Sequence, residues 1–158
     1  MKTIRGLVLL VAILCTLPLN LMARDRAPDR LRDSLAAYST PFSVLHTPAA
    51  GSQATITQAA AGTGVKNVVE GVCYGYSATT ALGGITTVTI NLRDGATGAG
   101  TILKSWQYTL PAAVLPSYAQ CLSGLHIQGT ANTATTIEFS ASVGNLMEFV
   151  SMDGYTLP

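Results

Sequence analysis

The chain has 158 residues and a formal net charge of +1, and only 11% of its residues are charged. Soluble proteins carry roughly 25% charged residues, so we expect a surface built mainly from Thr, Ser, Ala and Gly. The length allows one domain preceded by a leader. Beyond residue 40 the charged residues are Lys66, Arg93 and Lys104 against Glu70, Asp94, Glu138, Glu148 and Asp153. This mildly acidic balance argues against nucleic-acid binding, which needs a basic face to neutralise phosphates.

Residues 1–23 are a candidate export signal. Lys2 and Arg5 precede the apolar segment Gly6–Leu17, which has the length of a signal-peptide core. The cleavage context is poor, because Leu21 stands where a small residue is favoured. Three interpretations stay open: a cleaved signal peptide, an uncleaved membrane anchor, and a start codon assigned too far upstream.

Residues 24–52 combine a charged segment with a Ser, Thr, Pro and Ala-rich tether. Much of the chain's charge falls in residues 24–33, with the two signs nearly balanced. Helical spacing favours a short amphipathic helix and involves Leu31, Leu35 and Tyr38; a solvated linker is the alternative. The composition of residues 34–52 is typical of a tether ahead of a domain.

Residues 53–158 predict a single all-β domain. Short runs rich in Thr, Val, Ile and Leu are separated by Gly, Asn and Ser, as in the hairpin phrase around Asp94-Gly95. The regular spacing and the turn signals favour an antiparallel β-sandwich or jelly roll. The strands are expected at 53–60, 66–78, 85–93, 101–111, 119–128, 134–142 and 146–156.

Alternation within these strands predicts which side chains face the core. The strand at 85–93 is expected to bury Val88, Ile90 and Leu92, and the strand at 134–142 to bury Ile137, Phe139 and Ala141. The strand between them places four apolar residues on one face, with Lys104 of the same parity at the rim: Ile102, Trp106, Tyr108 and Leu110.

Small residues share one face of the strand at 66–78. Gly71, Cys73 and Gly75 alternate with larger residues, which predicts a very close neighbour or a bulge on that side. Cys73 and Cys121 are the two cysteines of the domain. If the chain is exported they form a candidate disulfide, and otherwise two buried thiols.

The search for catalytic chemistry assigns no catalytic, cofactor-binding or metal-binding residue. Gly95–Gly100 lacks the Lys-Ser/Thr ending of a phosphate loop, and His46 and His126 have no metal-binding spacing. Glu138 and Glu148 would approach each other if their strands paired, as in a glycosidase. The alternative for both is an outward charge that protects a sheet edge. The sequence therefore predicts a protein that is not an enzyme.

Four tyrosines are candidate binding residues, since aromatic rings can form a platform on which sugars stack. They are Tyr74, Tyr76, Tyr118 and Tyr155.

Two phrases of the sequence resemble a known group of proteins. Asn91–Leu103 (NLRDGATGAGTIL) and Leu122–Ser140 (LSGLHIQGTANTATTIEFS) look like segments of small β-sandwich proteins encoded in the structural regions of tailed phages and prophages. The resemblance covers about residues 53–158 and implies a head-decoration, tail-associated or fibre-associated virion component. Such a component would act through self-assembly and protein–protein contacts, and the resemblance supplies no functional residues.

The leader departs from that pattern, because virion proteins assembled in the cytoplasm need no export. The alternative is an exported periplasmic, cell-surface or secreted binding module directed at glycans. Expected partners are other virion or surface proteins and further copies of the chain, with membrane contact only through the leader.

Overall fold

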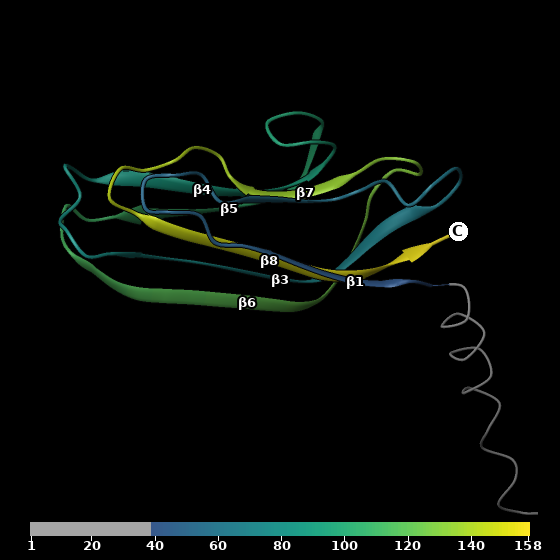
Figure 1. Ribbon diagram of the computed structural model, residues 1–158, viewed down its shortest axis with the longest axis horizontal. Helices are drawn as coiled ribbons and strands as arrows, with labels where there is room; N and C mark the ends of the chain where they lie inside the picture. The colour runs from purple at the N-terminus through teal and green to yellow at the C-terminus, as the bar shows by residue number, and fades with distance from the viewer. Residues whose placement is uncertain (1–38) are drawn as a thin grey trace, which may run out of the picture. The chain divides into compact units, whose positions relative to one another are not determined.

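The computed structural model describes residues 39–158 and forms a two-layer β-sandwich (Figure 1). The first sheet has the strand order β1-β8-β3-β6 and the second sheet β2-β7-β4-β5, with every pairing antiparallel. Two four-stranded sheets of this kind make an eight-stranded jelly roll. The all-β prediction is confirmed. The strands are β1 (Pro41–His46), β2 (Thr55–Gln58), β3 (Lys66–Ala78), β4 (Thr86–Asp94), β5 (Thr101–Leu110), β6 (Leu115–Gln128), β7 (Thr135–Phe139) and β8 (Met147–Leu157).

The hydrophobic core lies between the two sheets. Val88, Ile90 and Leu92 of β4 are buried, as are Ile137 and Phe139 of β7, which confirms these inward faces predicted from alternation. The predicted burial of Ala141 is wrong, because β7 ends at Phe139 and Ala141 lies exposed beyond it. The first sheet contributes buried side chains from β3 and β8, namely Val69, Val72, Tyr74, Val150 and Met152.

The sandwich begins earlier than the sequence predicts. β1 lies inside the expected tether and pairs with β8, with Phe42 opposite Gly154 and Val44 opposite Met152. Its short length and its Ser, Thr and Pro surroundings concealed a strand that buries only one face. The tether assignment is therefore wrong for residues 41–46.

The predicted export signal, charged segment and helix lie outside the described residues. Within residues 39–158 there is no helix that is long and apolar enough to cross a membrane.

Glycines in β3 permit the close contacts expected from the sequence. A Cβ on Gly75 would lie 2.2 Å from both the Phe149 ring and the Tyr118 carbonyl oxygen. A Cβ on Gly71 would lie 2.5 Å from an oxygen of Asp153, and the register shifts between Val69 and Gly71. The prediction of a close neighbour or a bulge is confirmed, and β3 shows a close neighbour at Gly75 and a register shift beside Gly71.

The predicted inward orientation of Ile102 is wrong, because the pairing of β4 with β5 contains a bulge. Lys104 lies opposite Leu92, whereas Ile102 lies opposite Arg93, so one extra residue enters β5 between them. The extra residue reverses the alternation, and Ile102 is 48% exposed. Trp106 and Tyr108 keep the predicted face and pack against the core.

Candidate functional site

The edge strand β6 is unusual in its lack of charge. It spans 14 residues, Leu115–Gln128, and contains no Asp, Glu, Lys or Arg. β6 hydrogen-bonds to β3 on one side and forms the edge of the first sheet on the other. Natural proteins usually protect such an edge with charges, because its free backbone groups can pair with another strand.

A disulfide joins β6 to its neighbour. Cys73 and Cys121 are opposite each other in the β3–β6 ladder and their sulfur atoms are bonded, with the Cα atoms 4.1 Å apart. This short Cα separation is typical of a non-hydrogen-bonded pair in an antiparallel ladder. The N–H and C=O groups of Cys121 therefore point away from β3, toward the open edge. By alternation the same holds for Ala119 and Ser123, which lie in the regular part of the ladder.

An aromatic cluster fills the space between β3, β5 and β6 on the inner side of this edge. The hydroxyl oxygens of Tyr74, Tyr108 and Tyr118 lie 2.9, 2.6 and 3.1 Å from Gln120 Oε1. Because each hydroxyl has one proton, only one of Tyr74 and Tyr108 donates to Gln120 while the other donates to its tyrosine neighbour. Tyr74 and Tyr108 also share a hydrogen bond, and the Trp106 ring lies 5.6 Å from that of Tyr74. Gln120 thus links the edge strand β6 to the edge strand β5 of the second sheet.

Burial raises the pKa of two of the tyrosines at this edge, Tyr74 and Tyr76. Burial raises the pKa of Tyr74 well above its ordinary value of 10.0, and the hydrogen bond with Tyr108 adds to the effect. These groups are therefore hydrogen-bond donors throughout the physiological pH range.

The four candidate tyrosines do not form one platform. Tyr76 and Tyr118 stack with their ring centroids 5.1 Å apart, and Tyr118 is 37% exposed. Tyr74 is fully buried, so no ligand can stack on it. Tyr155 pairs with Pro41 and Val68, at the opposite end of β3 from Tyr76.

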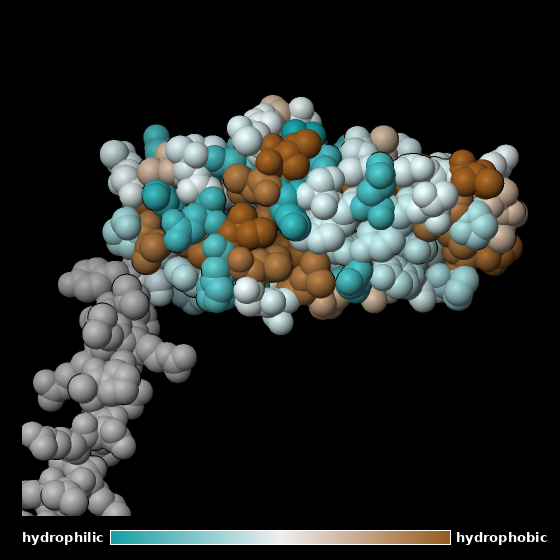
Figure 2. Space-filling view, turned by 180° about the vertical axis from the view of Figure 1, so that it is seen from behind, coloured by the Kyte–Doolittle hydropathy of each residue, from teal (hydrophilic) through white to brown (hydrophobic). Residues whose placement is uncertain are grey.

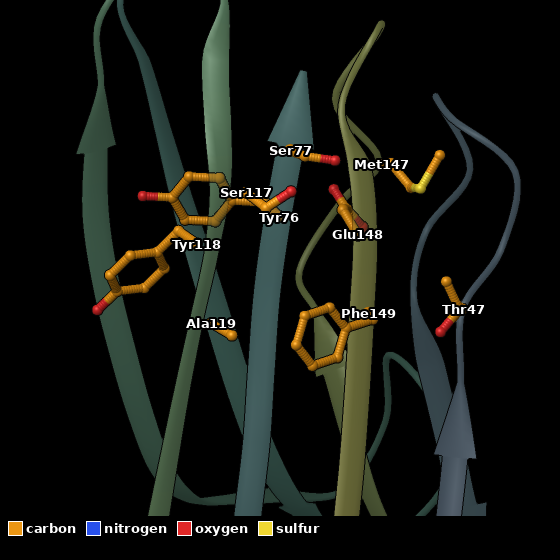
Figure 3. Close-up of a pocket in the computed structure, with 9 residues that line it drawn as sticks. All are labelled: Thr47, Tyr76, Ser77, Ser117, Tyr118, Ala119, Met147, Glu148 and Phe149. Carbon is orange, nitrogen blue, oxygen red and sulfur yellow. The ribbon is translucent and has the colours of Figure 1, made fainter. Parts of the chain in front are cut away.

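A shallow cavity of about 240 Å³ lies across β8, β3 and β6 (Figure 3). The Phe149 ring points from β8 toward β3, on the side where Gly75 leaves room for it. The stacked rings of Tyr76 and Tyr118 lie at the end of the cavity nearest β6. Small side chains with hydroxyl groups form another part of the lining. Its lining residues are Thr47, Tyr76, Ser77, Ser117, Tyr118, Ala119, Met147, Glu148 and Phe149.

Glu138 and Glu148 do not form a carboxylate pair. β7 and β8 belong to different sheets, so the strands that carry these residues do not pair with each other. Glu138 points away from the core and is covered by the β4–β5 loop, where Arg93 forms an ion pair with it and the Gly98 N–H donates to it at 2.8 Å. The glycosidase hypothesis is wrong, and so is the expected edge charge, because β7 is an inner strand and Glu138 is 1% exposed.

Glu148 is enclosed between the sheets. The Ala54 N–H donates to its Oε2 at 3.0 Å, while Oε1 has no hydrogen-bond partner. Burial raises the pKa of Glu148 to about 7, against the smaller lowering effects of the Ala54 and Val143 backbone N–H groups.

The histidines have structural roles in the described domain. His46 lies in β1, where its Nδ1 accepts a hydrogen bond from the Thr55 N–H at 3.1 Å. His126 is exposed, as predicted, with Nδ1 2.5 Å from Glu70 Oε1. Across residues 39–158, no three His, Cys, Asp or Glu side chains gather in a metal-binding arrangement.

Sequence reasoning missed Gln120 and Arg93 as organising residues. Gln120 shares the parity of Tyr118 and Leu122 in β6, which was a usable signal that its amide faces inward. No comparable signal existed for Arg93, since its partner Glu138 lies 45 residues away in the sequence.

Most charged side chains of the domain are buried or contact another group of the same domain. Arg93 pairs with Glu138, and the Asp94 carboxylate accepts the Thr130 N–H at 3.0 Å. Glu148 is buried and Glu70 contacts His126. The surface in Figure 2 accordingly shows broad pale areas of intermediate hydropathy with separate apolar areas between them.

Comparisons with known proteins give only distant structural likenesses. No family model and no curated protein matches the chain. A Desmodium yellow mottle tymovirus structure has a TM-score of 0.39 and 8% identity, covering 75% of this chain and 85% of that one. A Bacillus endospore appendage structure, from a family of disulfide-linked pili, has a TM-score of 0.32 and 18% identity, covering 76% and 88%. An arabinose-bound MgGH51 α-L-arabinofuranosidase has a TM-score of 0.36 and 11% identity, and the match covers 76% of this chain but 23% of the enzyme. We therefore infer function from the chain's own residues.

Proposed function

We propose that this chain is a non-enzymatic structural component of a virion that acts through self-assembly and protein–protein contacts. The proposal rests on one observation: the domain has few charged side chains, and most of these contact other groups of the same domain. Arg93, Glu138 and Glu148 are all withdrawn from the surface, and Asp94 is tied to a neighbouring loop. A surface with so little charge lacks the self-repulsion that keeps copies of a protein apart.

The disulfide supports a role in an oxidising environment outside the cytosol. Disulfides persist in extracellular and surface settings and are rare in the cytosol. Cys73 and Cys121 are 48 residues apart, and closing a loop of this length stabilises a fold by about 4 kcal/mol in the chain-entropy model. A particle component exposed to the medium would gain from such a bond, as would an exported module.

Peptide-level mass spectrometry of a fractionated source culture tests the proposal. Density-banded particles, medium, envelope and cytoplasm would be compared, with a cytosolic host protein as the contamination control. We expect the chain in the particle band at a fixed ratio to the other particle proteins. A chain found only as a dispersed monomer in the cytoplasm would overturn the proposal.

The first residue observed in the protein distinguishes a virion protein from an exported module. A particle-bound chain that starts downstream of residue 23 by internal initiation fits a virion protein. Cleavage near Ala23, or an intact leader in the envelope fraction, instead fits an exported module.

A second function, glycan binding by an exported module, is favoured by the exposed ring of Tyr118. This ring stacks on Tyr76 beside the cavity and offers an aromatic surface of the kind on which sugars stack. A broad glycan array with the unmodified chain, the Tyr118→Ala variant and the Tyr155→Ala control tests it. We expect any bound glycan to be lost only with Tyr118→Ala, and an array without binding by the unmodified chain would end this hypothesis.

A further inference from the structure

We propose that two copies of this chain pair antiparallel through their β6 edges and thereby join their first sheets into one eight-stranded sheet. This inference rests on the proposed assembly function and specifies the contact that begins it. The partner is a second copy, because the backbone groups and the side chains of the β6 edge match those of the same edge turned by a twofold axis.

The free backbone groups of β6 form a regular row. Ala119, Cys121 and Ser123 direct their N–H and C=O groups away from β3, as the Cα separation of the Cys73–Cys121 pair and the regular register on either side of it show. Pro116 precedes this segment, and positive φ angles at Gly124 and His126 interrupt the strand after it. The β3–β6 ladder also shifts its register between Tyr76 and Ala78, opposite Pro116 and Ser117, so the regular row comprises the residues from Tyr118 to Ser123.

Antiparallel pairing about a twofold axis at Gln120 places Ala119 opposite Cys121 of the second copy, and each of the two such pairs exchanges two hydrogen bonds. This register gives about four intermolecular hydrogen bonds within the regular row. The same patch is used by both copies, as a twofold interface requires.

The side chains on the inner face agree with the same register. Tyr118 would lie opposite Leu122 of the second copy at a non-hydrogen-bonded position, where cross-strand side chains are closest. Tyr118 is among the exposed large apolar side chains, and Leu122 is half-buried at the same edge. Pairing would cover both, and the Gln120 amide already holds Tyr118 in place.

The outer face offers no obstacle to the pairing. Its side chains are Ser117, Ala119, Cys121 and Ser123, all small, and no like charges meet across the axis. Edge strands that stay unpaired are usually protected by Lys, by inward charges or by a covering loop. The described part of the chain places no charged side chain on this strand, and the disulfide holds the strand to the sheet behind it.

Sedimentation velocity and hydrogen exchange on the full chain test the inference. At rising protein concentration we expect a dimer, together with slower exchange in peptides that cover Tyr118–Ser123. Ala119→Lys places two like charges near the axis and should weaken dimerisation at least tenfold. Ser43→Lys is the matched control, since Ser43 is exposed on β1, the opposite edge of the same sheet, and it should leave dimerisation unchanged.

Correct folding of each variant is established by an intact Cys73–Cys121 disulfide and an unchanged far-UV spectrum. A chain that stays monomeric at all concentrations overturns edge pairing, and so does a dimer that survives Ala119→Lys or shows no protection in β6. Particle fractionation separates the two failures. Retention of the chain in particles without a β6 contact would overturn the pairing alone, whereas its absence from particles would overturn the proposed function.

Discussion

At the scale of single residues, Glu148 shows how strongly the fold controls ionisation. The carboxyl group lies between the two sheets with one oxygen bonded to the Ala54 N–H and the other without a partner. Because burial raises the pKa of Glu148 from 4.5 to about 7, the folded protein binds this proton more tightly than the unfolded chain does. The stabilising contribution is complete below the unfolded pKa and is lost as the pH rises through the folded pKa.

Glu148→Gln should therefore flatten the pH dependence of stability. A shift of this size corresponds to a loss of about 3 kcal/mol in the unfolding free energy of the unmodified protein between acidic pH and about pH 8. The variant should be the more stable protein at the upper end of this window. Urea denaturation at a series of pH values measures the effect, with Asp153→Asn as the control at an exposed carboxyl. If the unfolding free energy depends on pH equally in Glu148→Gln and in the unmodified chain, the buried environment assigned to Glu148 is contradicted.

Gly75 is the second residue whose role the packing defines. Gly75→Ala would place a methyl group 2.2 Å from the Tyr118 carbonyl oxygen and the Phe149 ring, and a backbone carbonyl in a ladder cannot move aside. We expect a loss of about 2–3 kcal/mol in unfolding free energy, as for other overpacked sites.

Gly83→Ala is the matched control for this substitution, because a Cβ there meets nothing within 4 Å and the backbone has no positive φ. It should be neutral or slightly stabilising. Phe149→Ala in the Gly75→Ala background should recover only part of the loss, because the Tyr118 carbonyl stays in place. Chemical denaturation of the three variants gives these values, and equal stabilities for Gly75→Ala and Gly83→Ala would disprove the close contact.

At the scale of elements, β6 combines an open edge with a covalent attachment. The strand has one neighbour, β3, and the disulfide crosses that single interface. A strand with one neighbour has half the ladder hydrogen bonds of an inner strand, so the disulfide has a larger share in holding it.

Replacing both Cys73 and Cys121 by Ala should lower the unfolding free energy by about 4 kcal/mol. Hydrogen exchange should accelerate first in peptides of Leu115–Gln128, while the inner strand β4 keeps its protection. Unchanged stability, or exchange that accelerates equally in all strands, would show that the bridge does not anchor the edge.

Other elements show where local pattern is informative and where it fails. β3 was predicted with its observed bounds, because its apolar and β-branched residues extend between clear turn signals. β1 was missed because an edge strand buries one face only and its composition resembles a linker. Ile102 was placed on the wrong face because one extra residue in a strand reverses the alternation beyond it.

At the scale of the whole domain, the arrangement of strands determines which candidate sites exist. Placing β7 and β8 in different sheets separates Glu138 from Glu148 and removes the catalytic alternative that depended on these strands pairing. The same arrangement brings β3, β5 and β6 together and so assembles Tyr74, Tyr108 and Gln120 from separate segments. Tyr155 lies at the far end of the first sheet because β8 runs antiparallel to β3.

The sequence by itself determined the all-β class, most of the strands, the inward faces of β4 and β7, and the close approach at Gly75. These features depend on the two-residue period of a strand and on the absence of a Cβ, which are properties of neighbouring residues. Only the tertiary structure decided the sheet order, the burial of Glu138 under the β4–β5 loop and the exposure of the uncharged β6 edge. Backbone hydrogen bonds are alike for every antiparallel partner, so the choice of partner depends on side chains far apart in the sequence, and no local pattern records it.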